Sequence, residues 1–281
     1  VSNTNVLRNA LNYSKMVNAP IISHSEDEDL VNNGVMHEGY WSTKLGLKGI
    51  PGAAESIAVA RELELLRFTG GKIHFAHIST ARSIELIRRA KIEGLKVTCE
   101  VTPHHFSLTD EAMKAFDTNL KMNPPLRSAE DVSVIKEALA DGTIDAIATD
   151  HAPHTYEEKA QDLNNAPFGI IGLETAVGLT MTNLVHTGII TPIQAISYLS
   201  SNPAKIFDLE RGDLSVGSVA DITVIDPEME WTVDVDKFLS KARNTPFDGF
   251  KLKGKAVATI LNGRFIYNVI DRQEERTLIQ S

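Results

Sequence analysis

The sequence contains a single cysteine, Cys99, and no apolar run that approaches the length of a membrane-spanning helix. One cysteine cannot form an internal disulfide, which excludes a disulfide-stapled secreted protein and is typical of a reducing compartment. A membrane span needs about 20 consecutive apolar residues, and the opening residues VSNTNVLRNA lack the apolar core of a signal peptide. We therefore expect a soluble, cytoplasmic protein.

An excess of positive charge is also missing. Asp and Glu residues number 37 against 28 Lys and Arg residues, which gives a formal net charge of -9 at pH 7. No basic stripe stands out against this acidic background, which argues against a nucleic-acid-binding surface. Small molecules and other proteins are the expected partners.

Short β-branched runs alternate with longer helical stretches up to about Thr149, which is the pattern of parallel β/α units. The runs are continuously apolar, as in a sheet that is covered on both faces. The expected strands span residues 20–24, 72–77, 96–101 and 145–150, and the expected helices between them span residues 53–68, 81–94 and 128–142. Four units cannot close an eight-stranded barrel, which takes about 250 residues, so the pattern indicates an open sheet or half of a barrel.

The second half of the chain changes its pattern twice. Two further helices are expected, over residues 173–188 and 191–207. From about Asp208 the sequence becomes β-rich, and Asn262-Gly263 is the signal of a type I′ hairpin turn. We expect a small β-rich unit there, with a charged tail over residues 271–281 that is solvated or helical.

Three potential metal ligands lie at the ends of three different expected strands, namely His24, His77 and Asp150. The carboxyl ends of parallel strands meet at one edge of the sheet, so these side chains are expected to converge. Two imidazoles and a carboxylate suit Zn²⁺, which polarises carbonyl groups and lowers the pKa of a bound water to about 7. A lone strand-end histidine is more often structural, so the metal hypothesis depends on the three occurring together.

The remaining histidines near these ends have competing interpretations. His74 shares a sheet face with His77, but its apolar neighbours favour a packed structural role. His104 and His105 either line the pocket or serve the turn after Pro103, and we do not expect them to bind the metal. His154 either contacts substrate or is an exposed loop residue.

Two loops have the composition of ligand-binding segments. KMNPPLR places Asn123 and Arg127 around a stiffening proline pair, and NAPFGIIGLET has two glycines before a helix start. Prolines and glycines also mark ordinary turns, so both interpretations stay open on the residues alone.

Seven segments resemble, in order, those of the class I bacterial dihydroorotases of the amidohydrolase superfamily. The similarity runs over essentially the whole chain, and DHAPHTYEEK with PFGIIGLET differs from the corresponding loops of allantoinases and hydantoinases. The segments are ISHSEDEDL, KIHFAHIST, CEVTPHHFSLTDE, KMNPPLRS, DAIATDHAPHTYEEK, PFGIIGLETAV and TPFDGFKLKGKAVATILNGRFIY.

The resemblance implies a fold and an activity. Residues 1–208 would form the C-terminal half of a TIM-type (β/α)8 barrel, and residues 209–281 part of a small β-sandwich domain with a tail. The reaction would be the reversible cyclisation of N-carbamoyl-L-aspartate to L-dihydroorotate in pyrimidine synthesis. The cofactor would be one or two Zn²⁺ ions.

The resemblance also implies roles for individual residues. His24 and His77 would bind one zinc, while Asp150 would bind the other and act as the acid/base. Dihydroorotate or carbamoyl aspartate would be held by Asn123, His154, and the backbone of Phe168 and Gly169. Arg127 has no implied role, and we expect a loop or salt-bridge residue.

The chain departs from the family pattern in lacking the early HxH motif, the substrate-binding Arg near it, and a bridging Asp or carboxylated Lys. We therefore expect a truncated dihydroorotase without its first four barrel strands. A homodimer is expected, with aspartate transcarbamoylase as another potential partner. Two alternatives remain: another cyclic-amide hydrolase, of the allantoinase or dihydropyrimidinase type, or an inactive homologue that acts as a structural partner.

Overall fold

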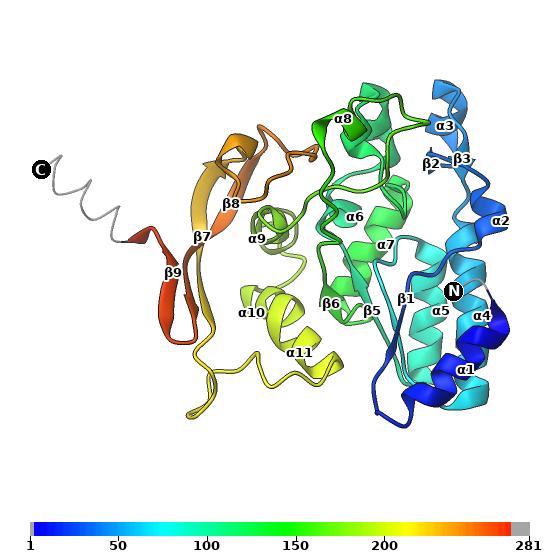
Figure 1. Cartoon of the computed structure of the whole chain (residues 1–281), viewed down its shortest axis with the longest axis horizontal. Coiled ribbons are helices and arrows are strands. Elements are labelled where there is room, and N and C mark those ends of the chain that lie inside the picture. Colours follow the sequence, from blue (N-terminus) through cyan, green and yellow to red (C-terminus); the bar gives the residue numbers. More distant parts are fainter. Residues whose placement is uncertain (1–2, 271–281) are drawn as a thin grey trace, which may run out of the picture.

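A four-stranded parallel sheet forms the centre of the computed structural model, which describes residues 3–270. Each strand pairs with the next along the chain, in the order β1-β4-β5-β6 (Figure 1). The strands are β1 (Ile21–Ser23), β4 (Ile73–Phe75), β5 (Val97–Val101) and β6 (Ala146–Ile147). All four lie within the expected ranges, so the β/α interpretation is confirmed.

Long helices form a layer outside this sheet. They are α1 (Thr4–Ser14), α4 (Ala53–Thr69), α5 (Ala81–Ile92) and α7 (Ala129–Ala140), and each packs against the next. Capping explains their bounds: the Ser128 side chain accepts a hydrogen bond from Asp131 N at the start of α7, and Gly142 follows its end with a φ of +80°. The three helices expected between strands are therefore present.

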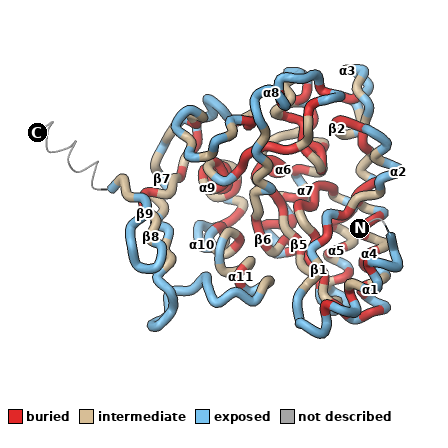
Figure 2. Tube along the Cα trace, viewed as in Figure 1, coloured by how far each residue is buried: buried red, intermediate tan, exposed pale blue. Residues whose placement is uncertain are grey.

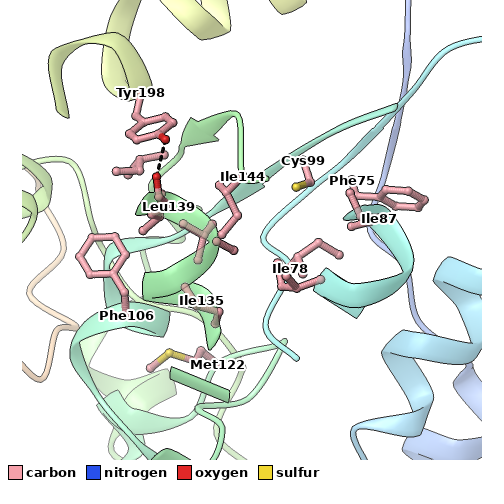
Figure 3. Close-up of a cluster of buried hydrophobic side chains, with 14 of the residues drawn as sticks. Phe75, Ile78, Ile87, Cys99, Phe106, Met122, Ile135, Leu139, Ile144 and Tyr198 are labelled. Carbon is pink, nitrogen blue, oxygen red and sulfur yellow. Dashed lines mark hydrogen bonds between the residues drawn. The ribbon is translucent and has the colours of Figure 1, made fainter. Parts of the chain in front are cut away.

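The apolar core lies between the sheet and these helices (Figure 3). Phe75 and Cys99 extend from neighbouring strands and are fully buried, while Ile135 and Leu139 line the facing side of α7. Burial raises the pKa of the Cys99 thiol to about 12, so this residue behaves as a small apolar side chain.

The two helices expected after the sheet are present but interrupted by π-helical turns. The first consists of α9 (Ala176–Thr180) and the turn Met181–Val185. The second consists of α10 (Pro192–Ile196), the turn Ser197–Ser201 and α11 (Asn202–Ile206). Figure 1 shows α9, α10 and α11 between the parallel sheet and the last three strands.

Short elements fill the connections that follow the carboxyl ends of the parallel strands. After β1 come α2 (Glu28–Val31), β2 (Met36–His37), α3 (Tyr40–Leu45) and β3 (Gly49–Ile50), with β2 and β3 paired in parallel. After β5 come α6 (Pro103–Ser107) and the 3₁₀ turns Asp110–Ala115 and Thr118–Leu120, and after β6 comes α8 (Tyr156–Lys159). These segments lie at the carboxyl edge of the sheet, next to the residues that follow the strands.

The β-rich unit is an antiparallel sheet of β7 (Ile222–Thr232), β8 (Lys251–Leu261) and β9 (Arg264–Asn268). A 3₁₀ turn, Val235–Lys237, lies between β7 and β8. Asn262 and Gly263 have φ values of +49° and +74°, as the expected type I′ turn requires. Figure 2 shows that buried residues concentrate in the β/α part, while β7 and β9 are largely exposed or half-buried. The charged tail, residues 271–281, lies outside the described residues.

Candidate active site

His24 and His77 converge at the carboxyl edge of the parallel sheet. His24 directly follows β1 and His77 follows β4, and these two strands are paired. The His24 Nδ1 and His77 Nε2 atoms lie 3.0 Å apart. Two nitrogens bound to one tetrahedral Zn²⁺ at about 2.0–2.1 Å would lie roughly 3.3 Å apart. The pair therefore fits two positions of a zinc site.

Asp150 lies near this pair without completing a cluster. It is exposed, and its negative charge raises the pKa of His77, although burial and the neighbouring His24 lower that pKa more strongly. Within residues 3–270, no group of three or more His, Cys, Asp or Glu side chains is arranged to hold a metal ion. The structure thus brings His24 and His77 together and leaves Asp150 beside them.

Both His77 and Asp150 have unusual backbone conformations. Their φ values are +36° and +47°, in the left-handed region that residues other than glycine seldom occupy. Such conformations cost about 1–3 kcal/mol each and cluster at functional sites, where the surrounding structure enforces them. Left-handed geometry therefore occurs at two of the three strand-end residues.

Glu26 links His24 to the Asn123 loop, a connection that the sequence analysis missed. Its Oε2 atom accepts a hydrogen bond of 2.6 Å from Asn123 Nδ2 and lies 3.6 Å from His24 Nε2. The interaction with His24, followed by that with Asn123, lowers the pKa of Glu26 against the opposing effect of burial. Within the acidic run SEDED this residue had no distinguishing signal other than its place just after a strand-end histidine.

His154, Phe168 and Gly169 are also brought together. The His154 Nε2 atom lies 2.9 Å from the carbonyl oxygen of Phe168, to which it donates. Asn244, which the sequence analysis also missed, holds the two loops: it accepts from His154 N at 3.1 Å and donates to Gly169 O at 3.2 Å. Phe168 and Glu26 line one open hollow of about 430 Å³, while His154 and Asn244 line a different one.

Three of the histidines with competing interpretations, His74, His104 and His105, are packed inside the protein, while His154 is half-buried. His74 is fully buried and contacts Thr98 Oγ1 at 2.8 Å and Glu100 Oε2 at 3.1 Å, as its structural interpretation predicts. His105 Nε2 lies 2.9 Å from Pro124 O and therefore donates to it, which supports the loop that contains Asn123. Burial lowers the pKa of both His104 and His105.

Arg127 is a loop residue, as expected, but it is almost completely buried, with 2% of its surface exposed. Its Nε donates to Ser79 Oγ at 3.0 Å and its Nη1 donates to Ile50 O at 3.2 Å. Of the two expected roles, loop residue or salt-bridge residue, the described part of the chain shows the first. The guanidinium connects the loop after β4 to the short strand β3.

Comparison with known proteins gives a consistent result. The chain matches the Amidohydrolase family over residues 2–266. It is 55% identical over 266 residues to a dihydroorotase from Pelotomaculum thermopropionicum, covering 95% of this chain and 62% of that protein. It is 54% identical over 267 residues to a dihydroorotase from Geobacter metallireducens, covering 95% of this chain and 63% of that protein. The chain thus spans less than two thirds of the length of these curated relatives.

Solved structures show the same fold. An L-hydantoinase (dihydropyrimidinase) from Arthrobacter aurescens matches with a TM-score of 0.86 and 27% identity, over 95% of this chain and 61% of that chain. A dihydropyrimidinase from Brevibacillus agri matches with a TM-score of 0.85 and 24% identity, over 95% of this chain and 60% of that chain. Because the identity to the Brevibacillus protein is only 24%, that similarity shows the fold alone.

Proposed function

The chain belongs to the amidohydrolase family, and we propose that the whole protein containing it is a dihydroorotase. The reaction is the reversible cyclisation of N-carbamoyl-L-aspartate to L-dihydroorotate in pyrimidine synthesis. The observation that carries the proposal is the His24–His77 pair at the strand ends, joined through Glu26 to the Asn123 loop. The curated relatives named dihydroorotase support it as well.

Zinc is the proposed cofactor, as one or two ions, with His24, His77 and Asp150 as ligands from this chain. When bound, zinc supplies a water whose pKa is lowered to about 7. Asp150 takes the proton released in the attack on the ring amide and returns it to the departing nitrogen, which is general base and then general acid work.

Asn123, His154 and the backbone of Phe168 and Gly169 are the proposed substrate-binding groups. Asn244 ties the His154 loop to Gly169, and Asn123 is bonded to Glu26, which lines an open hollow together with Phe168. Asn123 and His154 are proposed to contact the carboxylate and carbonyl oxygens of dihydroorotate.

The domain division belongs to the same proposal. Residues 1–208 are assigned to the C-terminal half of a TIM-type barrel and residues 209–281 to part of a β-sandwich domain. The end positions of β1 and β6 in the parallel sheet, where further strands would pair, support the first assignment. The antiparallel sheet β7-β8-β9 supports the second.

The proposed assembly is a homodimer in the cytoplasm, with aspartate transcarbamoylase as a second protein partner. No helix within the described part of the chain is long and apolar enough to cross a membrane. Sedimentation of the whole protein, alone and mixed with the transcarbamoylase, measures both associations.

A substrate panel tests the activity. The second candidate is hydantoinase activity, which the 27% identity to the Arthrobacter L-hydantoinase favours. We expect the whole protein to hydrolyse dihydroorotate and to leave hydantoin, dihydrouracil and allantoin unreacted. A preference for hydantoin would replace the dihydroorotase proposal with the second candidate.

The acid/base role is tested by Asp150→Asn. The loss of a positioned proton-transfer group costs about 10²–10⁴-fold in rate, and because Asp150 is exposed the fold should survive its replacement. We expect turnover of dihydroorotate to fall by that factor with an unchanged circular dichroism spectrum. The exposed Asp236→Asn is the control, and near-normal turnover by Asp150→Asn would refute the role.

A further inference from the structure

Helix α4 has two buried carboxylates on one face. Glu55 is 3% exposed and Glu62 is fully buried, and seven residues along a helix amount to about two turns, so both point the same way. Glu64 on the same helix has 74% of its side chain exposed and pairs with Arg67. A buried carboxylate is costly unless it is hydrogen-bonded. Two of them on one helix face therefore need an explanation.

Glu62 holds the residue that follows the first candidate ligand. Its Oε2 atom accepts a hydrogen bond of 2.9 Å from the hydroxyl of Ser25, which is 6% exposed and adjoins His24. Its Oε1 atom lies 3.3 Å from Arg61, which balances the charge. Through Ser25, the carboxylate fixes the direction in which the chain leaves β1.

Glu55 holds the residues that follow the second candidate ligand. Its two oxygens accept hydrogen bonds from the backbone N–H groups of Ser79, at 3.1 Å, and Thr80, at 3.0 Å, and from both hydroxyls. His77, two residues earlier, has the left-handed φ of +36°. A conformation of this kind persists only when its surroundings enforce it. The bonds to Glu55 restrain the chain two and three residues after His77.

The geometry points to a shared role, and we propose that Glu55 and Glu62 are positioning residues for the zinc site. One rigid helix fixes both strand-end loops, so the spacing of its two carboxylates sets the 3.0 Å separation of the His24 and His77 ring nitrogens. The inference rests on the metal site of the proposed function. Glu62 contacts Ser25, and Glu55 contacts Ser79 and Thr80, so each would act on the metal ligands through the loop that it holds.

Metal affinity tests the role without use of the catalytic reaction. Co²⁺ replaces Zn²⁺ as the probe, and its absorption spectrum and dissociation constant are measured on the whole protein by competition with a chelating dye. Outer-shell substitutions commonly weaken metal binding about 10–100-fold. We expect Glu55→Gln and Glu62→Gln to weaken Co²⁺ binding at least about tenfold and to alter its visible spectrum. Glu64→Gln, on the exposed face, should match the wild type.

A purely structural role predicts a different outcome. In that case the melting temperature of the metal-free variants falls, while those molecules that fold bind Co²⁺ with the wild-type constant and spectrum, which overturns the proposal. Ser25→Ala removes the Glu62 contact from the loop side and gives a second test where Glu62→Gln fails to fold. A wild type that binds Co²⁺ but does not hydrolyse dihydroorotate contradicts the dihydroorotase proposal alone and leaves the positioning role intact.

Discussion

Gly169 has a backbone conformation that favours glycine, and it lies so close to Ala152 that there is no room for a side chain. Its φ is +112°, and a Cβ atom at this position would lie 2.6 Å from the Ala152 Cβ. Its N–H donates to Lys121 O at 3.0 Å and its carbonyl accepts from Asn244 at 3.2 Å. The loop is therefore held on both sides and cannot move away from Ala152 without loss of hydrogen bonds.

Replacement of Gly169 by alanine should damage the proposed substrate site. The clash pushes the Phe168 carbonyl away from His154, and the backbone strain costs about 1–3 kcal/mol. We expect Gly169→Ala to raise the KM for dihydroorotate about tenfold, measured by initial rates. Gly188→Ala is the matched control because Gly188 also has a positive φ, +76°, with nothing within 4 Å of an added Cβ. Equal KM values for the two variants would contradict the assignment.

The strand-end pattern was enough to predict that His24 and His77 lie close together, since the carboxyl ends of neighbouring parallel strands lie side by side. The contacts of Glu26 and Asn244 could not be predicted from the sequence, for two different reasons. Glu26 was hidden in a run of like residues, and Asn244 directly precedes one of the family-like segments but reaches His154 across 90 positions of sequence. Side chains that tie loops together leave no local pattern, so only three-dimensional structure reveals them.

Among the elements, the short helix α6 supports the Asn123 loop through one neutral histidine. His105 Nε2 donates to Pro124 O at 2.9 Å, so its Nδ1 is the acceptor for the Thr102 hydroxyl at 2.7 Å. Burial lowers the pKa of His105 to about 3 from its ordinary value of 6.5, assisted by the charges of His77 and Arg127. A second proton would remove the acceptor that Thr102 uses.

Protonation of His105 should therefore destabilise the fold in acid. Between about pH 6.5 and pH 3 the unfolded chain binds this proton and the folded chain does not. Stability thus falls as the pH is lowered through this window, by up to about 1.4 kcal/mol per pH unit for one proton. We expect His105→Gln, whose amide can still donate to Pro124 O, to flatten the curve of unfolding free energy against pH. Urea titrations at several pH values measure it, and an unchanged slope would contradict the role.

The long elements were predictable and the short ones were not. Helices α5 and α7 begin at the side-chain caps Thr80 and Ser128, and α4 ends at Gly70, so their ranges follow from local sequence. The two-residue strands β2 and β3 and the turn-like helices α2 and α8 are too short to show any periodicity. Tertiary contacts, such as that of Arg127 with Ile50 O, hold these segments in place.

At the scale of the whole molecule, the proposed chemistry is concentrated at the carboxyl edge of the parallel sheet. The outer helices cover the core, while the connections after the strands hold every proposed ligand and substrate-binding residue (Figure 1). The sequence pattern predicted the parallel sheet and the β-rich unit. It left open whether the sheet is an open one or half of a barrel, because four β/α units are compatible with both.

Zinc bound between two strands should stabilise the whole fold. His24 and His77 meet only in the folded state, so a metal that both bind favours that state by RT ln(1 + [metal]/Kd), about 2.7 kcal/mol at a hundredfold excess over Kd. Because the unfolding entropy grows with chain length, at about 2.1 cal/mol/K per residue, we expect EDTA to lower the melting temperature by about 3 °C, measured by calorimetry on the whole protein. His77→Ala should melt at one temperature with or without EDTA. Mg²⁺ should not restore the loss, since it prefers oxygen ligands. Identical melting of the wild type with and without EDTA would show that the histidine pair is a structural contact and would remove the basis of the zinc site.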